Sequence, residues 1–218
     1  MMGKFFLAIE GLTGVGKTSL AKLLKPIFNA ELILELGQDN PYLKYYFQDK
    51  STYGLPSQLY FLLDRFHQYQ ILIPEYLKTH NVISDHLFSR DWIFACLALE
   101  DESLDAYKKV YQCLAPHIPH PDLVIILYAS NETLLKRLKN RGDDTDIWAE
   151  TFLEKLRKAY DEFFTTYSDA RCICINTEGI NYLESPESLN RLVKLISDNW
   201  EYVPFGKKFN ITELSNEV

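Results

Sequence analysis

Short apolar runs alternate along the chain with longer segments whose apolar residues recur at helical spacing. Buried strands are predicted at 5–9, 32–34, 82–83, 123–127 and 171–175. Amphipathic helices are predicted at 18–28, 59–77, 152–163 and 189–196. Strands that are apolar on both faces and separated by helices predict an α/β fold, in which a five-stranded parallel sheet carries helices on both faces.

Pro and Gly residues interrupt this pattern and mark the loops between the predicted elements. The sequence shows no linker, internal repeat or low-complexity segment. With 218 residues, 47% of them hydrophobic, the chain can bury one large core. We therefore expect one domain over residues 1–199. Residues 200–218 are expected to form an extended or flexible tail.

Charge and cysteine content narrow the function classes. The formal net charge is −7 and no block of Lys or Arg stands out, which disfavours nucleic-acid and membrane-surface binding but allows an anionic small ligand. No apolar run approaches the ~20 residues that span a bilayer, and no secretory signal is evident. Four cysteines are too few for a disulfide scaffold. A reduced, cytoplasmic protein is expected.

The segment Gly11-Leu12-Thr13-Gly14-Val15-Gly16-Lys17-Thr18 matches G-x-x-x-x-G-K-[ST] in full. A buried strand precedes it and an amphipathic helix follows, as this phosphate-binding motif requires. Glycines allow backbone N–H groups to turn toward phosphate oxygens, Lys17 reaches the outer phosphates and the Thr18 hydroxyl ligates Mg²⁺. The motif predicts nucleotide binding without specifying a reaction.

Two carboxylates follow predicted strands. Glu35 comes after the strand at 32–34, and Asp85 after the strand at 82–83. In a parallel sheet both lie at the carboxyl edge, where the phosphate loop also opens. One can hold the metal ion while the other accepts a proton from a substrate hydroxyl. Either residue alone also fits a helix cap or a solvated turn.

Gln58 and Arg65 lie two helical turns apart on one face, with Phe61 between them. An amide offers the donor and acceptor that the edge of a base requires, and Arg65 can pair with a carboxylate such as Asp91. Nearby aromatic residues suit the stacking of a flat base. The same spacing also fits the polar face of a core helix, so the pattern alone leaves both interpretations open.

Taken together, these segments resemble the deoxynucleoside kinase family, in particular its bacterial deoxyadenosine/deoxyguanosine kinase-like branch. The matching segments are 11–19, Glu35 with 39–43, 58–65, 84–88 with 91–95, 137–142 and 152–156. The resemblance implies a P-loop NTPase fold of the nucleoside-monophosphate-kinase type. It also implies transfer of a phosphoryl group from ATP, with Mg²⁺, and a homodimer.

The resemblance assigns roles position by position. Glu35 resembles the catalytic carboxylate that takes the proton from the sugar 5′-hydroxyl, and Gln58 the glutamine that reads the base edge. Arg65 resembles the arginine beside the base and the reacting hydroxyl, with Asp91 as its acidic partner. Asp85 resembles the acid that opens the family's Glu-Arg-Ser segment. The ATP-phosphate site is expected to comprise Gly11, Thr13, Gly14, Val15, Gly16, Lys17, Thr18 and Ser19, with Arg137 and Arg141 as lid arginines. The metal site is expected at Thr18 and Asp85, and the nucleoside site is expected to include Phe61.

Several positions depart from the family pattern. Asp85-His86-Leu87 stands where many members have Glu-Arg-Ser, so His86 replaces an arginine. Arg141-Gly142-Asp143 replaces the lid's Arg-Gly-Arg and lacks one cation. The tyrosine expected at the sugar 3′-hydroxyl falls nearest Phe47, beside Tyr46. A second sugar-contacting acid is expected at Asp144 or Asp146.

The sequence thus predicts a deoxynucleoside kinase that transfers the γ-phosphoryl of ATP to the 5′-hydroxyl of a deoxynucleoside, preferably a purine such as deoxyadenosine, in nucleotide salvage. An acid at position 35 favours a neutral acceptor over a monophosphate. The alternatives are a nucleoside monophosphate kinase of the thymidylate-kinase type and a nucleotide-binding regulatory homologue.

Overall fold

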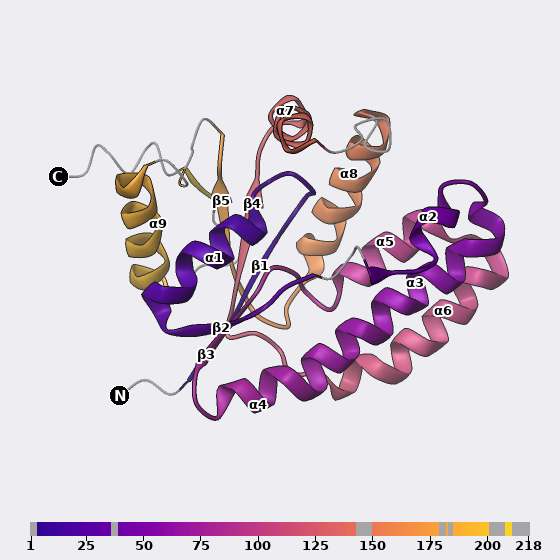
Figure 1. Cartoon of the computed structure of the whole chain (residues 1–218), viewed down its shortest axis with the longest axis horizontal. Coiled ribbons are helices and arrows are strands. Elements are labelled where there is room, and N and C mark those ends of the chain that lie inside the picture. The colour runs from indigo at the N-terminus through magenta and orange to yellow at the C-terminus, as the bar shows by residue number, and fades with distance from the viewer. Residues whose placement is uncertain are drawn as a thin grey trace.

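A six-stranded, fully parallel sheet forms the centre of the computed structural model, which describes residues 4–35, 39–142, 150–178, 182, 185–200 and 208–210 (Figure 1). The strand order is β2-β3-β1-β4-β5-β6. The strands are β1 (Phe6–Gly11), β2 (Ala30–Ile33), β3 (Asn81–Ser84), β4 (Leu123–Tyr128), β5 (Arg171–Asn176) and β6 (Lys208–Asn210).

Helices cover both faces of this sheet (Figure 1). They are α1 (Lys17–Phe28), α2 (Leu43–Tyr46), α3 (Lys50–His67), the π-helical turn η2 (Gln68–Leu72), α4 (Ile73–Leu77), α5 (Arg90–Ala98), α6 (Asp101–Leu114), the 3₁₀ turn η3 (Ala115–His117), α7 (Asn131–Arg141), α8 (Glu150–Thr166) and α9 (Pro186–Asp198). The helix predicted at 59–77 is part of the run α3–η2–α4.

All five predicted strands are confirmed, and the α/β class with them. The difference is β6, which pairs in parallel with β5 at Cys174 and Lys208 and lies within the stretch assigned to the tail. Its three residues carry no apolar run that distinguishes them from a loop. Trp200, the first residue of that stretch, packs against Phe5 with the two rings tilted and their centroids 4.5 Å apart.

Successive side chains of β1 point to opposite faces of the sheet and contribute to two separate hydrophobic cores. Leu7 and Ile9 face the core that contains α1 and α9, whereas Phe6 and Ala8 face the core beneath α3 and α6. Glu10 continues the second series at the end of the strand and is fully buried. The sheet therefore places a carboxylate beside the phosphate loop.

Within the described part of the chain, no helix is both long enough and apolar enough to cross a membrane. The same residues contain no cluster of three or more His, Cys, Asp and Glu side chains able to hold a metal ion. All four cysteines are free.

Candidate active site

The glycine-rich loop connects β1 to α1 in a conformation that glycine makes possible. Gly14 and Gly16 adopt φ values of 85° and 105°, in the left-handed region. A Cβ at Gly11 would lie 2.3 Å from the Leu127 carbonyl oxygen. The Lys17 ammonium donates to the Gly11 carbonyl at 2.8 Å, so its charge lies over the loop.

Two side chains from distant parts of the chain brace this loop. The Tyr182 hydroxyl donates to the Gly16 carbonyl at 3.0 Å. Arg137 donates to the Val15 carbonyl at 3.1 Å and to the Thr177 carbonyl at 2.8 Å. Arg137, expected to contact donor phosphates, thus joins the loop to the segment after β5.

Asp85 connects the loop to the neighbouring strand ends. Its Oδ2 accepts from the Thr18 hydroxyl at 2.5 Å, and its Oδ1 accepts from the Glu35 backbone N–H at 2.9 Å. Burial opposes ionisation, but hydrogen bonds from His86 and Thr18 outweigh it and hold the pKa of Asp85 well below its usual range. The predicted meeting of Glu35 and Asp85 at the loop is confirmed.

The donors beside the loop fit a hard divalent cation. A hydroxyl and an ionised carboxylate, from Thr18 and Asp85, are oxygen ligands of the kind that Mg²⁺ takes together with substrate phosphates. The hydrogen bond between Thr18 and Asp85 shows that the two oxygens lie close enough together to bind one cation. When bound there, Mg²⁺ would neutralise charge on the phosphates.

Glu35 is held by two arginines. Arg65 is 4% exposed; its Nη2 lies 2.5 Å from Glu35 Oε1, and its Nη1 pairs with Asp91. The predicted Arg65–Asp91 pair is therefore confirmed. Burial opposes ionisation of Glu35, but Arg90 and then Arg65 lower its pKa to about 2. Glu35 is thus ionised at neutral pH.

Sequence reasoning missed Glu10 and Arg90. Glu10 accepts hydrogen bonds from the Gly11 N–H at 2.8 Å, the Leu87 N–H at 2.9 Å and the Tyr160 hydroxyl at 3.1 Å. Arg90 Nη1 lies 3.7 Å from Glu10 Oε1 and 3.5 Å from Glu35 Oε2. A charged residue directly after an apolar strand and before the first loop glycine was the available signal for Glu10.

The buried cations affect one another. Burial, reinforced by the charge of Arg90, lowers the pKa of Lys17 to about 8. Such repulsion requires the two side chains to share one region of the site. The carboxylates of Glu10, Glu35 and Asp85 oppose this lowering, so Lys17 lies among charges of both signs.

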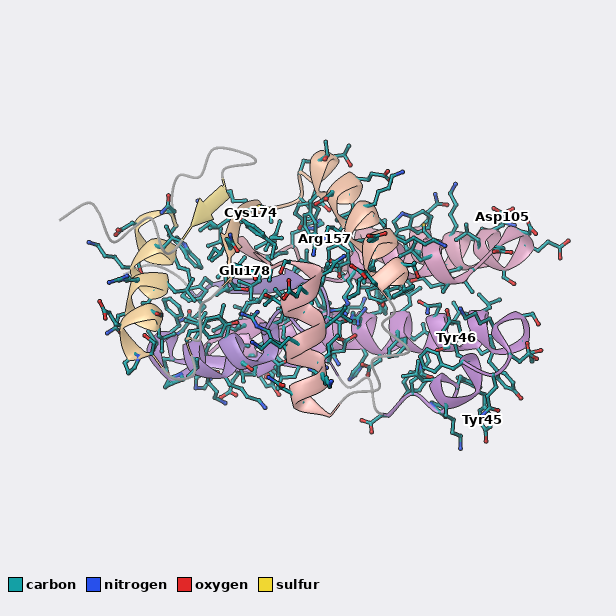
Figure 2. All side chains as sticks on the ribbon, turned by 90° about the horizontal axis from the view of Figure 1, so that it is seen from above. Tyr45, Tyr46, Asp105, Arg157, Cys174 and Glu178 are labelled. Atoms are coloured by element: carbon teal, nitrogen blue, oxygen red, sulfur yellow. The ribbon has the colours of Figure 1, made fainter. Side chains whose placement is uncertain are left out.

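The predicted nucleoside-binding residues divide into two groups. Gln58 and Arg65 are both buried on α3, with Phe61 half-buried between them. Tyr46 ends α2 and contacts Phe47, which is 47% exposed. Figure 2 shows Tyr46 at the end of the molecule formed by α2, α3 and α6, away from Arg157 and Glu178.

The remaining predicted residues are half-buried, exposed or outside the described part of the chain, apart from the buried His86. Thr13 and Ser19 are half-buried in the loop and the first turn of α1. Arg141 is exposed at the end of α7. Asp144 and Asp146 lie outside the described residues. His86, at the position of the family's arginine, is fully buried with its Nδ1 3.2 Å from Asp85.

Comparison with known proteins agrees with this geometry. The family model described as deoxynucleoside kinase matches residues 7–200. The chain belongs to the deoxynucleoside kinase family. It is 35% identical to a deoxyguanosine kinase of Bacillus subtilis over 72% of this chain and 76% of that one. It is 33% identical to a deoxyadenosine kinase of Dictyostelium discoideum over 96% of this chain and 85% of that one.

Solved structures support the fold. Deoxyadenosine kinase from M. mycoides with bound dATP superposes with a TM-score of 0.69 at 22% identity, covering 89% of this chain and 99% of that one. Thymidylate kinase from Candida albicans gives a TM-score of 0.62 at 18% identity, over 90% and 92% of the two chains. The likeness to thymidylate kinase is one of fold alone. Family membership makes this protein an ATP-dependent phosphotransferase with deoxynucleoside kinase activity, which is favoured over both alternatives.

Proposed function

We propose that the protein transfers the γ-phosphoryl of ATP to the 5′-hydroxyl of a purine deoxynucleoside, with Glu35 as the general base. The observation that carries the proposal is the position of Glu35: its carboxylate is ionised, held by Arg65 and joined through its backbone to Asp85 beside the phosphate loop. An acceptor phosphate would be repelled there, whereas a neutral hydroxyl would not.

In the proposed reaction the 5′-oxygen forms a bond to the γ-phosphorus. The bond from that phosphorus to the β–γ bridging oxygen breaks, and its electron pair leaves with ADP. The hydroxyl proton passes to a carboxylate oxygen of Glu35. Lys17 and the loop N–H groups bind the phosphates, and Thr18 and Asp85 would hold Mg²⁺.

Base recognition is assigned to the buried face of α3. Gln58 is only 7% exposed on this face, where it neighbours the buried Arg65 on the same helix. Its amide offers both the donor and the acceptor that the edge of a base requires. Gln58 is therefore proposed to pair with the base edge, with Phe61 beside it. The purine preference follows the two relatives named above, which are deoxyguanosine and deoxyadenosine kinases.

Location and assembly are further proposals. Four free cysteines fit a reducing, cytoplasmic compartment. Leu63 and Ile71 are 53% and 50% exposed on the continuous run α3–η2, which offers an apolar strip to a second copy of the chain.

One assay tests the proposed function. The protein is incubated with Mg-ATP and a panel of deoxynucleosides, ribonucleosides and nucleoside monophosphates, and phosphorylated products are separated. Product from purine deoxynucleosides is expected. Product from monophosphates alone, or from no acceptor, would contradict the proposal.

Glu35→Gln tests the base. Turnover is expected to fall by ~100-fold or more, the usual size of a general-base contribution, while ATP binding persists. Glu31→Gln is the matched control because Glu31 lies on β2 and, within the part of the chain that the structure describes, pairs with Lys25 on the surface. Equal turnover in the two variants would remove Glu35 from its role.

A further inference from the structure

Arg90 is a buried cation for which the structure offers no complete set of partners. It is the first residue of α5 and is 6% exposed. Its guanidinium lies over the Phe94 ring, 4.9 Å from the centroid. One of its terminal nitrogens, Nη1, is inaccessible to solvent and has no hydrogen-bond partner among the described residues.

The carboxylates near Arg90 do not fix its position. Nη1 lies 3.5 Å from Glu35 Oε2 and 3.7 Å from Glu10 Oε1, both beyond a good charge-assisted hydrogen bond. Glu10 already accepts hydrogen bonds from Gly11, Leu87 and Tyr160. Arg90 is thus held in the site by charge, and the hydrogen-bonding capacity of Nη1 is unused among the described residues.

These observations place Nη1 of Arg90 between the proposed proton acceptor and the start of the phosphate loop. Glu35 is the proposed proton acceptor, and Glu10 immediately precedes the first loop glycine. We propose that Arg90 is a catalytic residue that donates to the phosphoryl group during its transfer. This inference rests on the proposed function and adds a second buried arginine to it, alongside Arg65.

Proton transfer gives Arg90 a reason to act in the transition state. While Glu35 is ionised, its Oε2 attracts the guanidinium. As the carboxylate accepts the 5′-hydroxyl proton it loses that charge, and negative charge develops on the transferring phosphoryl oxygens and on ADP. The strongest anionic partner of Arg90 then becomes the phosphoryl group. An interaction that strengthens only at this stage raises kcat rather than substrate affinity.

His86 does not compete for this role in the structure. It stands where the family pattern has an arginine, but its ring is fully buried, contacts Tyr69 and directs Nδ1 to Asp85. Arg90 brings a guanidinium to the same region from α5, four residues further along the chain. Arg90 therefore supplies a cation to the site although His86 stands at the position of the family's arginine.

Arg90→Met and Arg90→Lys test the assignment. Methionine keeps an apolar stem against Phe94 and removes the charge, whereas lysine keeps the charge and removes the planar fork. Arg157→Lys is the control for changing a partly buried structural arginine, because among the described residues the Arg157 guanidinium donates to Ala129 and Asn131. Each variant is measured for kcat, for Kd of Mg-ATP and of the deoxynucleoside, for thermal unfolding, and for binding of ADP–aluminium fluoride with the deoxynucleoside.

The expected result for Arg90→Met is a fall in kcat of at least ~100-fold, with weaker binding of ADP–aluminium fluoride and both substrate Kd values within about threefold of wild type. Arg90→Lys should recover part of the loss, and Arg157→Lys should leave kcat unchanged. Unchanged kcat in folded Arg90→Met, or a parallel loss of stability and of both substrate affinities, would overturn the assignment. Wild-type turnover tests the proposed function separately; if it were absent, equal binding of ADP–aluminium fluoride by wild type and Arg90→Met would still overturn the role of Arg90.

Discussion

Arg137 donates a hydrogen bond of 3.1 Å to the carbonyl oxygen of Val15, across 122 residues of chain. The same guanidinium bonds both the hydroxyl and the carbonyl oxygen of Thr177. The phosphate loop is therefore fastened to α7 and to the end of β5 by one side chain. This contact separates the two arginines that the motif comparison grouped together, since Arg141 is exposed on the same helix.

Replacement of Arg137 should affect both the fold and the use of ATP. In Arg137→Met the loop loses one of its two braces, so we expect a lower melting temperature, by about 2–4 °C for each ~1 kcal/mol lost, together with a raised KM for ATP. Arg141→Met, the matched control at the exposed end of the same helix, should alter ATP kinetics and lower the melting temperature by less than Arg137→Met does. Calorimetry and steady-state kinetics on the two proteins provide the comparison. A change in KM without any loss of stability in Arg137→Met would contradict a bracing role.

The Thr18 hydroxyl should control the requirement for Mg²⁺. Thr18→Val removes the oxygen but keeps the shape, so we expect the Mg²⁺ concentration for half-maximal activity to rise by about 10-fold or more. Thr18→Ser retains the hydroxyl beside Asp85 and should stay near wild type. Activity is titrated with Mg²⁺ at fixed ATP. Identical titration curves for the valine and serine variants would remove Thr18 from the metal site.

Gly16 should tolerate no side chain. A Cβ there would meet the Tyr182 hydroxyl at 2.3 Å, at a φ of +105°. Gly16→Ala is expected to abolish ATP binding because both the backbone and the contact are strained. Gly142→Ala provides the control, since Gly142 also has positive φ but no described atom would lie within 4 Å of its Cβ. That variant should lose only ~1–2 kcal/mol of stability and keep its ATP affinity. If Gly16→Ala bound ATP with wild-type affinity, the prediction would be wrong and the loop would be able to accommodate a side chain at this position.

We expect ionisation of Asp49 to make the stability of α3 depend on pH. Its carboxylate caps the helix by accepting from the Thr52 N–H at 3.1 Å, and the Thr52 and Ser51 hydrogen bonds lower the pKa of Asp49 to about 2 from 3.8. A folded-state pKa below the unfolded one gives stabilisation that is present above pH ~4 and is lost as pH falls toward ~2.

The measurement is the difference in melting temperature between wild type and Asp49→Ala. We expect this difference to be constant from about pH 7 to 5 and to shrink below pH ~4. Asp49→Asn also caps helices but does not titrate, so its advantage over alanine should persist. A difference in melting temperature between wild type and Asp49→Ala that increases as the pH falls would contradict the prediction.

Local patterns predicted much of this molecule. The five strands followed from runs such as 123–127, whose residues are apolar on both sheet faces, and the phosphate loop followed from contiguous residues. Glu35 and Asp85 could be brought together because the ends of parallel strands share one edge. The Arg65–Asp91 pair followed from the family pattern.

The parts that were missed depend on contacts between distant segments. Nothing near Glu10 in the sequence indicates that Tyr160 donates to it or that Arg90 lies beside it. Arg137 fits a lid arginine by spacing, and only its contact with Val15 reveals the brace. The partners that stabilise a buried charge come from segments that are distant in the sequence. The hydrophobic periodicity of the chain does not indicate which segments those are.

The strand order β2-β3-β1 has a consequence for how activity is acquired during folding. Glu35, Asp85 and the glycine loop follow three strands that are neighbours in the sheet but are separated along the chain by helical crossovers. Loop closure over such distances precedes any gain from pairing, so sheets of this kind form slowly. Nucleotide binding should consequently reappear late in refolding, together with the pairing of β1 and β3 and not with the formation of individual helices.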